Sequence, residues 1–326
     1  MARIALDAMG GDHAPHETVS GALDAAARGV DVVLVGDEAV LDARLDELGG
    51  RLPVVHAPEV IEMAEDPAAA IRSKKGASVM VAAGLVADGD AVGMVSAGST
   101  GAALAAAAFV IGRIKGVARP AIAAIFPLGT PTVVLDVGAN LDVKPEHLVQ
   151  FAVMGSVVAE VYLGVEDPAV GLLNIGEEET KGREVEKEAF RLIGAAPVRF
   201  IGNVEGRDLG AGVADVVVSD GFTGNVLLKS AEGTARAVGR YVLDGLAAVV
   251  DDEVRKAAAV VRPHLLKLWE KFDPDAYGGA HLVGARGTVV IAHGSSSRVA
   301  VANALRLASE GAERDLVGRI EVGLRG

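Results

Sequence analysis

The stretch "AVGMVSAGSTGA" (residues 91–102) has the pattern that decides the fold: an apolar run, a break of small and polar residues, and the start of a helical pattern. Continuous aliphatic runs are typical of strands buried on both faces of a parallel sheet. Two further runs, at 30–37 and 198–208, also predict strands. The full pattern recurs in "RIALDAMGGD" (3–12), "TVVLDVGAN" (132–140), "VGLLNIGEEETKG" (170–182), "DVVVSDGFTGN" (215–225) and "TVVIAHGSSS" (288–297).

This alternation of strands and helices predicts an α/β fold with three α/β/α layers, in which helices cover both faces of a largely parallel central sheet. The composition agrees, because 51% of the 326 residues are hydrophobic and only 3% are aromatic. Small aliphatic residues suit helices packed closely on a buried sheet. No linker, low-complexity tract or long repeat interrupts the chain, so we expect residues 1–326 to form a single domain.

Net charge and residue usage exclude several classes of function. The formal charge of −13 argues against a broad nucleic-acid interface, which normally needs a basic face. The absence of cysteine excludes disulfides, thiolate zinc sites and thiol catalysis. The N-terminus lacks the pattern of a signal peptide, and the longest apolar run, 102–111, is shorter than the ~18 to 20 residues of a membrane span. We therefore expect a cytoplasmic protein.

The polar residues after the strands predict an anion site, and phosphate is the natural anion. Ligands of parallel sheets bind at the carboxyl ends of the strands, where the first N–H groups of the following helix are unpaired. The alternative is that these residues only form turns and cap helices. The candidates for binding phosphate or another part of the substrate are Asp7, Gly10, Gly11, His13, Ser96, Gly98, Ser99, Thr100, Gly101, Asn140, Asp220, Gly221, Thr223, His293, Gly294 and Ser295.

Two further polar residues, Lys181 and Asn225, should project from strand-end loops or first helical turns. The alternatives are that Lys181 is a solvated partner of Glu177 or Glu178, and that Asn225 only caps a helix.

Other kinds of site have less support in the sequence. Asp7, Asp12 and His13 are too few ligands for a usual metal site. The "HGSSS" stretch at 293–297 is no Gly-x-Ser-x-Gly elbow, and neither a P-loop nor a Gly-x-Gly-x-x-Gly turn follows a strand. Covalent catalysis and nucleotide binding are therefore not supported.

Residues 254–272, "VRKAAAVVRPHLLKLWEKF", form an amphipathic stretch in which five basic residues accompany one acid. Pro263 should kink or split this helix. The stretch is interpreted either as a core or dimer-interface helix or as a helix on an anionic membrane surface. The candidates for membrane contact are Val261, Leu265, Leu268 and Trp269.

From end to end the sequence resembles the bacterial phosphate acyltransferases of phospholipid synthesis, the acyl-carrier-protein:phosphate acyltransferase family. It departs from the family at Ser99, where the usual residue is Asn, and at Ser219, which is often Cys. The resemblance is carried by "DAMGGDHAP" (7–15), "VSAGSTGA" (95–102), "GRIKGVARPA" (112–121), "LDVGANLDVKPEHL" (135–148), "GLLNIGEEETKG" (171–182), "GNVEGRD" (202–208), "VVVSDGFTGNVLLK" (216–229), "YGGAHLVG" (277–284) and "IAHGSS" (291–296).

The resemblance implies transfer of a fatty acyl group from acyl carrier protein to inorganic phosphate, and the acyl phosphate product would feed glycerol-3-phosphate acyltransferase. It also implies an isocitrate/isopropylmalate dehydrogenase-like fold with two intertwined lobes, a homodimer, peripheral contact with anionic membrane, and neither metal nor nucleotide cofactor. Residues 243–272 would then form a dimer-tip or membrane-contact segment.

A mechanism compatible with these residues is direct attack of phosphate on the thioester, with Lys181 and Asn225 as the catalytic residues. His13 or His293 is the candidate proton donor to the departing thiolate. Two rivals stay open at this point: a metal- and nicotinamide-dependent β-decarboxylating dehydrogenase of the same fold, and a non-catalytic scaffold for acyl carrier protein.

Overall fold

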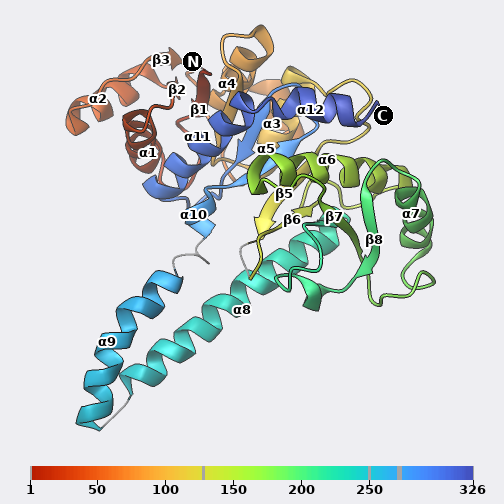
Figure 1. Ribbon diagram of the computed structural model, residues 1–326. Coiled ribbons are helices and arrows are strands. Elements are labelled where there is room, and N and C mark those ends of the chain that lie inside the picture. The colour runs from red at the N-terminus through yellow and green to blue at the C-terminus, as the bar shows by residue number, and fades with distance from the viewer. Residues whose placement is uncertain (1, 127–128, 249–250, 270–273, 326) are drawn as a thin grey trace.

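The computed structural model describes residues 2–126, 129–248, 251–269 and 274–325. In these ranges one mixed sheet of 11 strands runs through the molecule in the order β3-β2-β1-β4-β11-β10-β5-β6-β9-β7-β8 (Figure 1). The strands are β1 (Ile4–Asp7), β2 (Val32–Gly36), β3 (Val54–His56), β4 (Gly93–Ser96), β5 (Ala121–Phe126), β6 (Thr132–Leu135), β7 (Ala169–Leu173), β8 (Arg199–Val204), β9 (Val216–Val218), β10 (Ala280–Val283) and β11 (Thr288–Ile291).

Helices cover the sheet on both faces, which confirms the predicted α/β class. A π-helical turn (Ala107–Ile111) continues α5. The helices are α1 (His16–Ala27), α2 (Glu38–Leu48), α3 (Pro67–Ser73), α4 (Ser78–Asp88), α5 (Thr100–Ala106), α6 (Pro145–Leu163), α7 (Glu184–Gly194), α8 (Gly221–Ala247), α9 (Asp252–Trp269), α10 (Pro274–Tyr277), α11 (Arg298–Glu313) and α12 (Leu316–Gly323).

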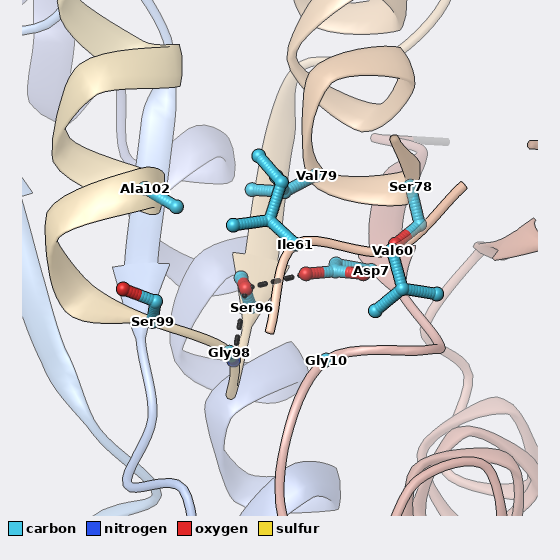
Figure 2. A pocket seen from close by; sticks show the side chains of 10 residues that line it. All are labelled: Asp7, Gly10, Val60, Ile61, Ser78, Val79, Ser96, Gly98, Ser99 and Ala102. Atoms are coloured by element: carbon cyan, nitrogen blue, oxygen red, sulfur yellow. Dashed lines mark hydrogen bonds between the residues drawn. The ribbon is translucent and has the colours of Figure 1, made fainter. Parts of the chain in front are cut away.

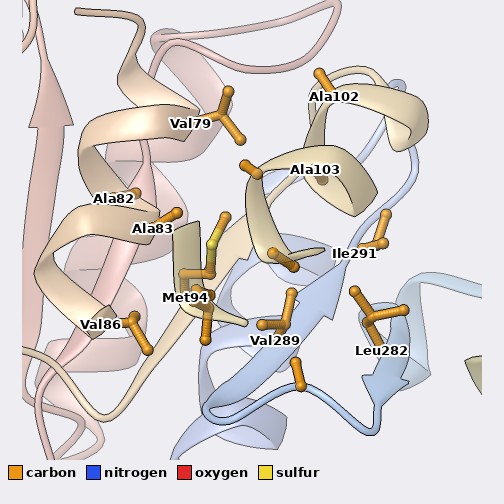
Figure 3. Close-up of a cluster of buried hydrophobic side chains, with 14 of the residues drawn as sticks. Val79, Ala82, Ala83, Val86, Met94, Ala102, Ala103, Leu282, Val289 and Ile291 are labelled. Carbon is orange, nitrogen blue, oxygen red and sulfur yellow. The ribbon is translucent and has the colours of Figure 1, made fainter. Parts of the chain in front are cut away.

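Alternate residues of the central strands enter different hydrophobic clusters. In β1, Ala5 packs into the cluster under α4 and α5, whereas Ile4 and Leu6 pack into the cluster under α1 and α11. Figure 3 shows the first of these clusters between α4, α5 and strands β4, β10 and β11. A third cluster lies under α6, α7 and α12. The continuous aliphatic runs are therefore explained by burial on both faces of the sheet.

The eight predicted strands are all present, and β3, β5 and β10 are additional. The β10 strand pairs antiparallel with both β11 and β5, and β5 pairs antiparallel with β6. Three successive reversals mean that β6, β9 and β7 run opposite to β1, β4 and β11. The carboxyl ends of these two sets of strands therefore point to opposite edges of the sheet.

Helix α8 begins against the loop that follows β6. The Gly221 N–H donates to the Asn140 carbonyl at 2.7 Å, and a Cβ atom at Gly224 would lie only 2.0 Å from the Asp136 carbonyl oxygen. The backbone of α8 thus approaches the loop more closely than any residue with a side chain permits. This contact fixes the position of Asn225, the next residue of the helix.

Beyond its first turns, α8 leaves the sheet and pairs with α9 in a helical hairpin that projects from the body (Figure 1). Helix α9 continues through Pro263, so the prediction that this proline splits the helix was wrong. Val261 is exposed and Leu265 is half-buried, whereas the side chains of Leu268 and Trp269 lie outside the described residues. No helix in the described ranges is long and apolar enough to cross a lipid bilayer.

We expect Gly224→Ala to lower the free energy of unfolding by about 1–3 kcal/mol, because its methyl group displaces α8 from the Asp136 carbonyl. The control is Gly233→Ala in the same helix, where a Cβ meets nothing within 4 Å. That change should stabilise the protein by about 0.5–1 kcal/mol through helix propensity. Chemical denaturation measures both, and equal stability of the two variants would contradict the close approach.

Candidate functional site

The loops after β1, β4 and β11 meet at one edge of the sheet, and we call residues 8–15, 97–101 and 292–297 the first junction group. The Asp12 N–H donates to the Gly294 carbonyl at 2.8 Å and joins the first and third of these loops. Gly10 packs against the Gly98 backbone, where a Cβ would lie 2.9 Å from the Gly98 nitrogen. Three loops that are far apart in sequence therefore form one surface.

The Asp7 side chain supports the first junction group through Ser96 and Gly98 (Figure 2). Its carboxylate is buried and accepts a 2.7 Å hydrogen bond from the Ser96 hydroxyl, which in turn accepts one from the Gly98 N–H at 3.1 Å. Burial raises the pKa of Asp7 above its ordinary value. At 2% and 1% exposure, Asp7 and Ser96 orient the Gly98 backbone and line only the small pocket of Figure 2.

Other predicted residues of this group reach solvent. His13, Thr100 and His293 are exposed, and Nδ1 of His293 lies 2.8 Å from the Ser295 hydroxyl. Ser99 precedes α5, but its side chain makes no capping hydrogen bond and lines the small pocket of Figure 2 together with Gly98.

The loops after β6, β7 and β9 form a second junction group, residues 136–144, 174–183 and 219–225. Its centre is Asp136, which is fully buried and accepts hydrogen bonds from Ile122 N at 3.0 Å, Gly138 N at 3.0 Å and Ala139 N at 3.0 Å. Asn140 adds two more from its backbone and side chain, at 2.7 and 2.8 Å. Burial raises the pKa of this carboxyl group, and the hydrogen bonds from Ala139, Ile122, Gly138 and the Asn140 side chain oppose that shift.

The loop that carries Lys181 is held by two asparagines. Asn174 Nδ2 donates to the Lys181 carbonyl at 3.1 Å, and Asn203 Nδ2 donates to the Glu178 carbonyl at 2.9 Å. The Lys181 ammonium lies 3.9 Å from Glu178, and its side chain is 47% exposed. The predicted partner Glu178 is thus at the far limit of an ion pair, and the ammonium is accessible to a ligand.

Arg183 joins the Lys181 loop to the start of α8. Its guanidinium donates to Asp220 Oδ2 at 2.5 Å and to both carboxylate oxygens of Glu186. Asp220 is the N-cap of α8 and accepts from Thr223 N at 2.7 Å. Burial opposes the ionisation of Asp220, but the bonds from Thr223 and Arg183 outweigh it and hold its pKa below the ordinary value.

The cap alternative for Asn225 is therefore wrong, because Asp220 caps α8 and Asn225 lies exposed one turn further along. The strand-end loops from which the sequence predicts an anion site fall into two groups, because the sheet reverses direction between them. Among the described residues no hydrogen bond joins the two groups. The helices that leave them, α5 and α8, nevertheless pack on one common hydrophobic cluster, through Ala102 and Leu228.

Sequence reasoning missed Asp136, Asn174, Arg183 and Asn203. Each of these residues lies inside or beside a motif quoted above. Asp136 could have been predicted, because it is an acid that directly follows the buried run "TVVL". In the described part of the chain, no three His, Asp or Glu side chains gather closely enough to hold a metal ion.

Comparison with solved structures shows the same fold in other enzymes at low sequence identity. A phosphotransacetylase from Streptococcus pyogenes superposes with a TM-score of 0.64 and 18% identity, over 96% of this chain and 94% of that one. A 4-hydroxythreonine-4-phosphate dehydrogenase from Klebsiella pneumoniae gives a TM-score of 0.57 and 14% identity, over 95% of this chain and 99% of that one.

Comparison of sequences shows the family. A family model described as fatty acid synthesis protein matches residues 2–319. A phosphate acyltransferase from Desulforamulus reducens is 49% identical, over 99% of this chain and 98% of its own length. Another, from Pelotomaculum thermopropionicum, is 50% identical, over 97% and 93%. The chain therefore belongs to the fatty acid synthesis protein family, in which these full-length relatives are phosphate acyltransferases.

Proposed function

We propose that this protein transfers a fatty acyl group from acyl carrier protein to inorganic phosphate and so forms an acyl phosphate. Glycerol-3-phosphate acyltransferase would then use the product for phosphatidic acid synthesis. The family supports an acyltransferase that uses phosphate. One observation carries the proposal for the substrates and the product. In the second junction group the Lys181 ammonium is accessible, and Arg183 connects the loop of Lys181 to the start of α8.

In this proposal, phosphate binds at the second junction group. The amino end of a 27-residue helix favours negative charge, and Lys181 adds a full positive charge. The Asp220 carboxylate at the same helix end would repel phosphate if it stood alone. Arg183 pairs with it at 2.5 Å and also with Glu186, so one guanidinium offsets part of the charge of two carboxylates, and Lys181 supplies the free positive charge for the anion.

The reaction proposed is direct attack by a phosphate oxygen on the thioester carbonyl carbon. The new C–O bond forms a tetrahedral oxyanion, which Lys181 or Asn225 stabilises, and the C–S bond then breaks. Hydrogen phosphate carries one proton, the acyl phosphate dianion carries none, and the departing thiolate takes that proton up. The reaction therefore needs no proton from outside the substrates, and His13 or His293 of the first junction group is not required as a proton donor.

The first junction group would bind another part of the acyl substrate. Its accessible groups are the Thr100 and Ser295 hydroxyls and the imidazoles of His13 and His293, whereas Asp7 keeps the Gly98 backbone in place. We assign phosphate and this other part of the acyl substrate to different groups because the two sets of strands run in opposite directions.

We also propose that the α8–α9 hairpin serves the homodimer contact and the contact with an anionic membrane. The support is that the hairpin projects from the body (Figure 1). It also leaves apolar side chains open to solvent. These side chains are Val238, Tyr241, Val242, Val254, Val260 and Val261.

The function is tested by phosphate-dependent release of free carrier from purified acyl carrier protein. We expect Lys181→Ala and Asn225→Ala to lower kcat by about 100- to 1,000-fold each, as loss of an oxyanion donor does. The matched control is Lys187→Ala, which removes a lysine of α7 that pairs with Glu184 at 2.8 Å. Near wild-type turnover of either folded variant would exclude its role, and a wild-type protein that binds carrier without releasing it would favour the scaffold.

Arg183→Ala should raise the KM for phosphate about tenfold and change kcat less, because the Asp220 charge is then exposed to the anion. Asp220→Asn in the Arg183→Ala background should restore the KM, since asparagine caps helices well and carries no charge. Arg191→Ala, which breaks an ion pair with Glu188 on α7, is the control. Failure of Asp220→Asn to restore the KM would show that Arg183 does not act by offsetting the charge of Asp220.

A further inference from the structure

The loop before β5 is basic in a protein that is otherwise acidic. Residues 91–135 contain no Asp or Glu, although the whole chain has 44 acids against 31 Lys and Arg. The basic residues of this stretch, Arg113, Lys115 and Arg119, lie within seven positions of each other. Positive charge is therefore concentrated in a stretch that has no acidic residue.

This loop surrounds an open hollow of about 480 Å³, lined by residues 112–117 and by Arg286 from the β10–β11 turn. The Arg286 guanidinium is fixed by a 3.0 Å hydrogen bond to the Ile111 carbonyl. Arg113 donates to the Ala118 carbonyl and closes the loop on itself. These bonds hold the loop around the hollow, and Arg113, Lys115 and Arg286 are exposed there.

The cations around this hollow lack acidic partners. Within the described residues Arg113, Lys115, Arg119 and Arg286 form no ion pair with Asp or Glu, unlike Arg298, which pairs with Asp24. Lys144, at the start of α6, also forms no ion pair with an acid of the described ranges. Its charge adds to that of Arg119 at His147, whose pKa is lowered by burial and then by these two cations. Arg119 and Lys144 therefore act on the same imidazole, where the neighbouring Glu146 opposes them, so positive charge borders both the hollow and the start of α6.

The basic surface borders the second junction group. Pro120, the residue after Arg119, accepts a 2.8 Å hydrogen bond from Asn140 Nδ2, and the Asn140 carbonyl accepts from Gly221 N at the start of α8. Two hydrogen bonds thus connect the basic loop to the helix that carries Asn225. A partner bound on this surface would hold its cargo beside that group.

We propose that Arg113, Lys115, Arg119, Lys144 and Arg286 form the docking surface for the acidic carrier protein that delivers the acyl group. The inference rests on the proposed function, which supplies a carrier as the donor. A protein partner fits better than a membrane, because Ile114 and Val117 are buried at 3% and 5% exposure and leave the loop no large apolar group to insert. Opposite charges at such a rim speed association and fix orientation.

The test is the double variant Lys115→Glu/Arg119→Glu, because neither side chain makes a hydrogen bond in the described structure. At low salt the KM for acyl carrier protein should rise about tenfold or more, with a weaker dependence on ionic strength. The kcat at saturating carrier and the KM for phosphate should not change. The control, Arg28→Glu/Arg51→Glu, reverses the same number of charges at the β1–β2–β3 end and should leave all three values unchanged.

Direct binding of fluorescently labelled carrier separates this proposal from the proposed function. Wild-type binding that the double variant loses supports the surface, even if the wild type transfers no acyl group and the proposed function fails. Equal carrier affinity of wild type and double variant overturns the surface, even where transfer is normal. If the double variant keeps carrier affinity but loses binding to phosphatidylglycerol vesicles, the surface is a membrane contact and the proposal is also overturned.

Discussion

The second junction group depends on the buried carboxylate of Asp136. It accepts five hydrogen bonds, three of them from the backbone of the turn that follows it. A carboxylate removed from water is stable only when its oxygens are satisfied in this way, so the turn has little freedom to take another shape. The same turn presents the carbonyls of Asp136 and Asn140 to α8, and the packing of Gly221 and Gly224 on them sets the start of that helix.

The reversal of strand direction at β10, β5 and β6 is the second constraint. In a wholly parallel sheet the six loops would share one edge, and any of them could serve one ligand. Here the antiparallel strands β10 and β5 separate these loops into two groups, and hydrogen bonds join the loops within each group. Direct transfer needs the phosphate oxygen and the thioester carbon at one place, so in this account the first junction group holds only a part of the acyl donor away from the thioester.

Much of the fold could be predicted from the sequence, because a strand buried on both faces has a local signature. The β5 strand, "AIAAIF", was missed because alanine favours helices, and β10 was missed because its four residues contain a buried histidine. Strand direction has no local signature at all, so the division into two groups could not be foreseen. The sequence correctly placed Lys181 on a strand-end loop. The ion pair that connects this loop to α8 could not be predicted, because Arg183 and Asp220 are 37 positions apart in the sequence.

The central claim is that phosphate itself attacks the thioester and that no acyl-enzyme forms. The most direct measurement is intact-protein mass spectrometry after rapid quenching of enzyme mixed with acyl carrier protein in phosphate-free buffer. The account predicts an unmodified enzyme mass at all times, with acyl phosphate and free carrier appearing together once phosphate is added. An enzyme species heavier by one acyl group, formed without phosphate and discharged when phosphate is supplied, would contradict it.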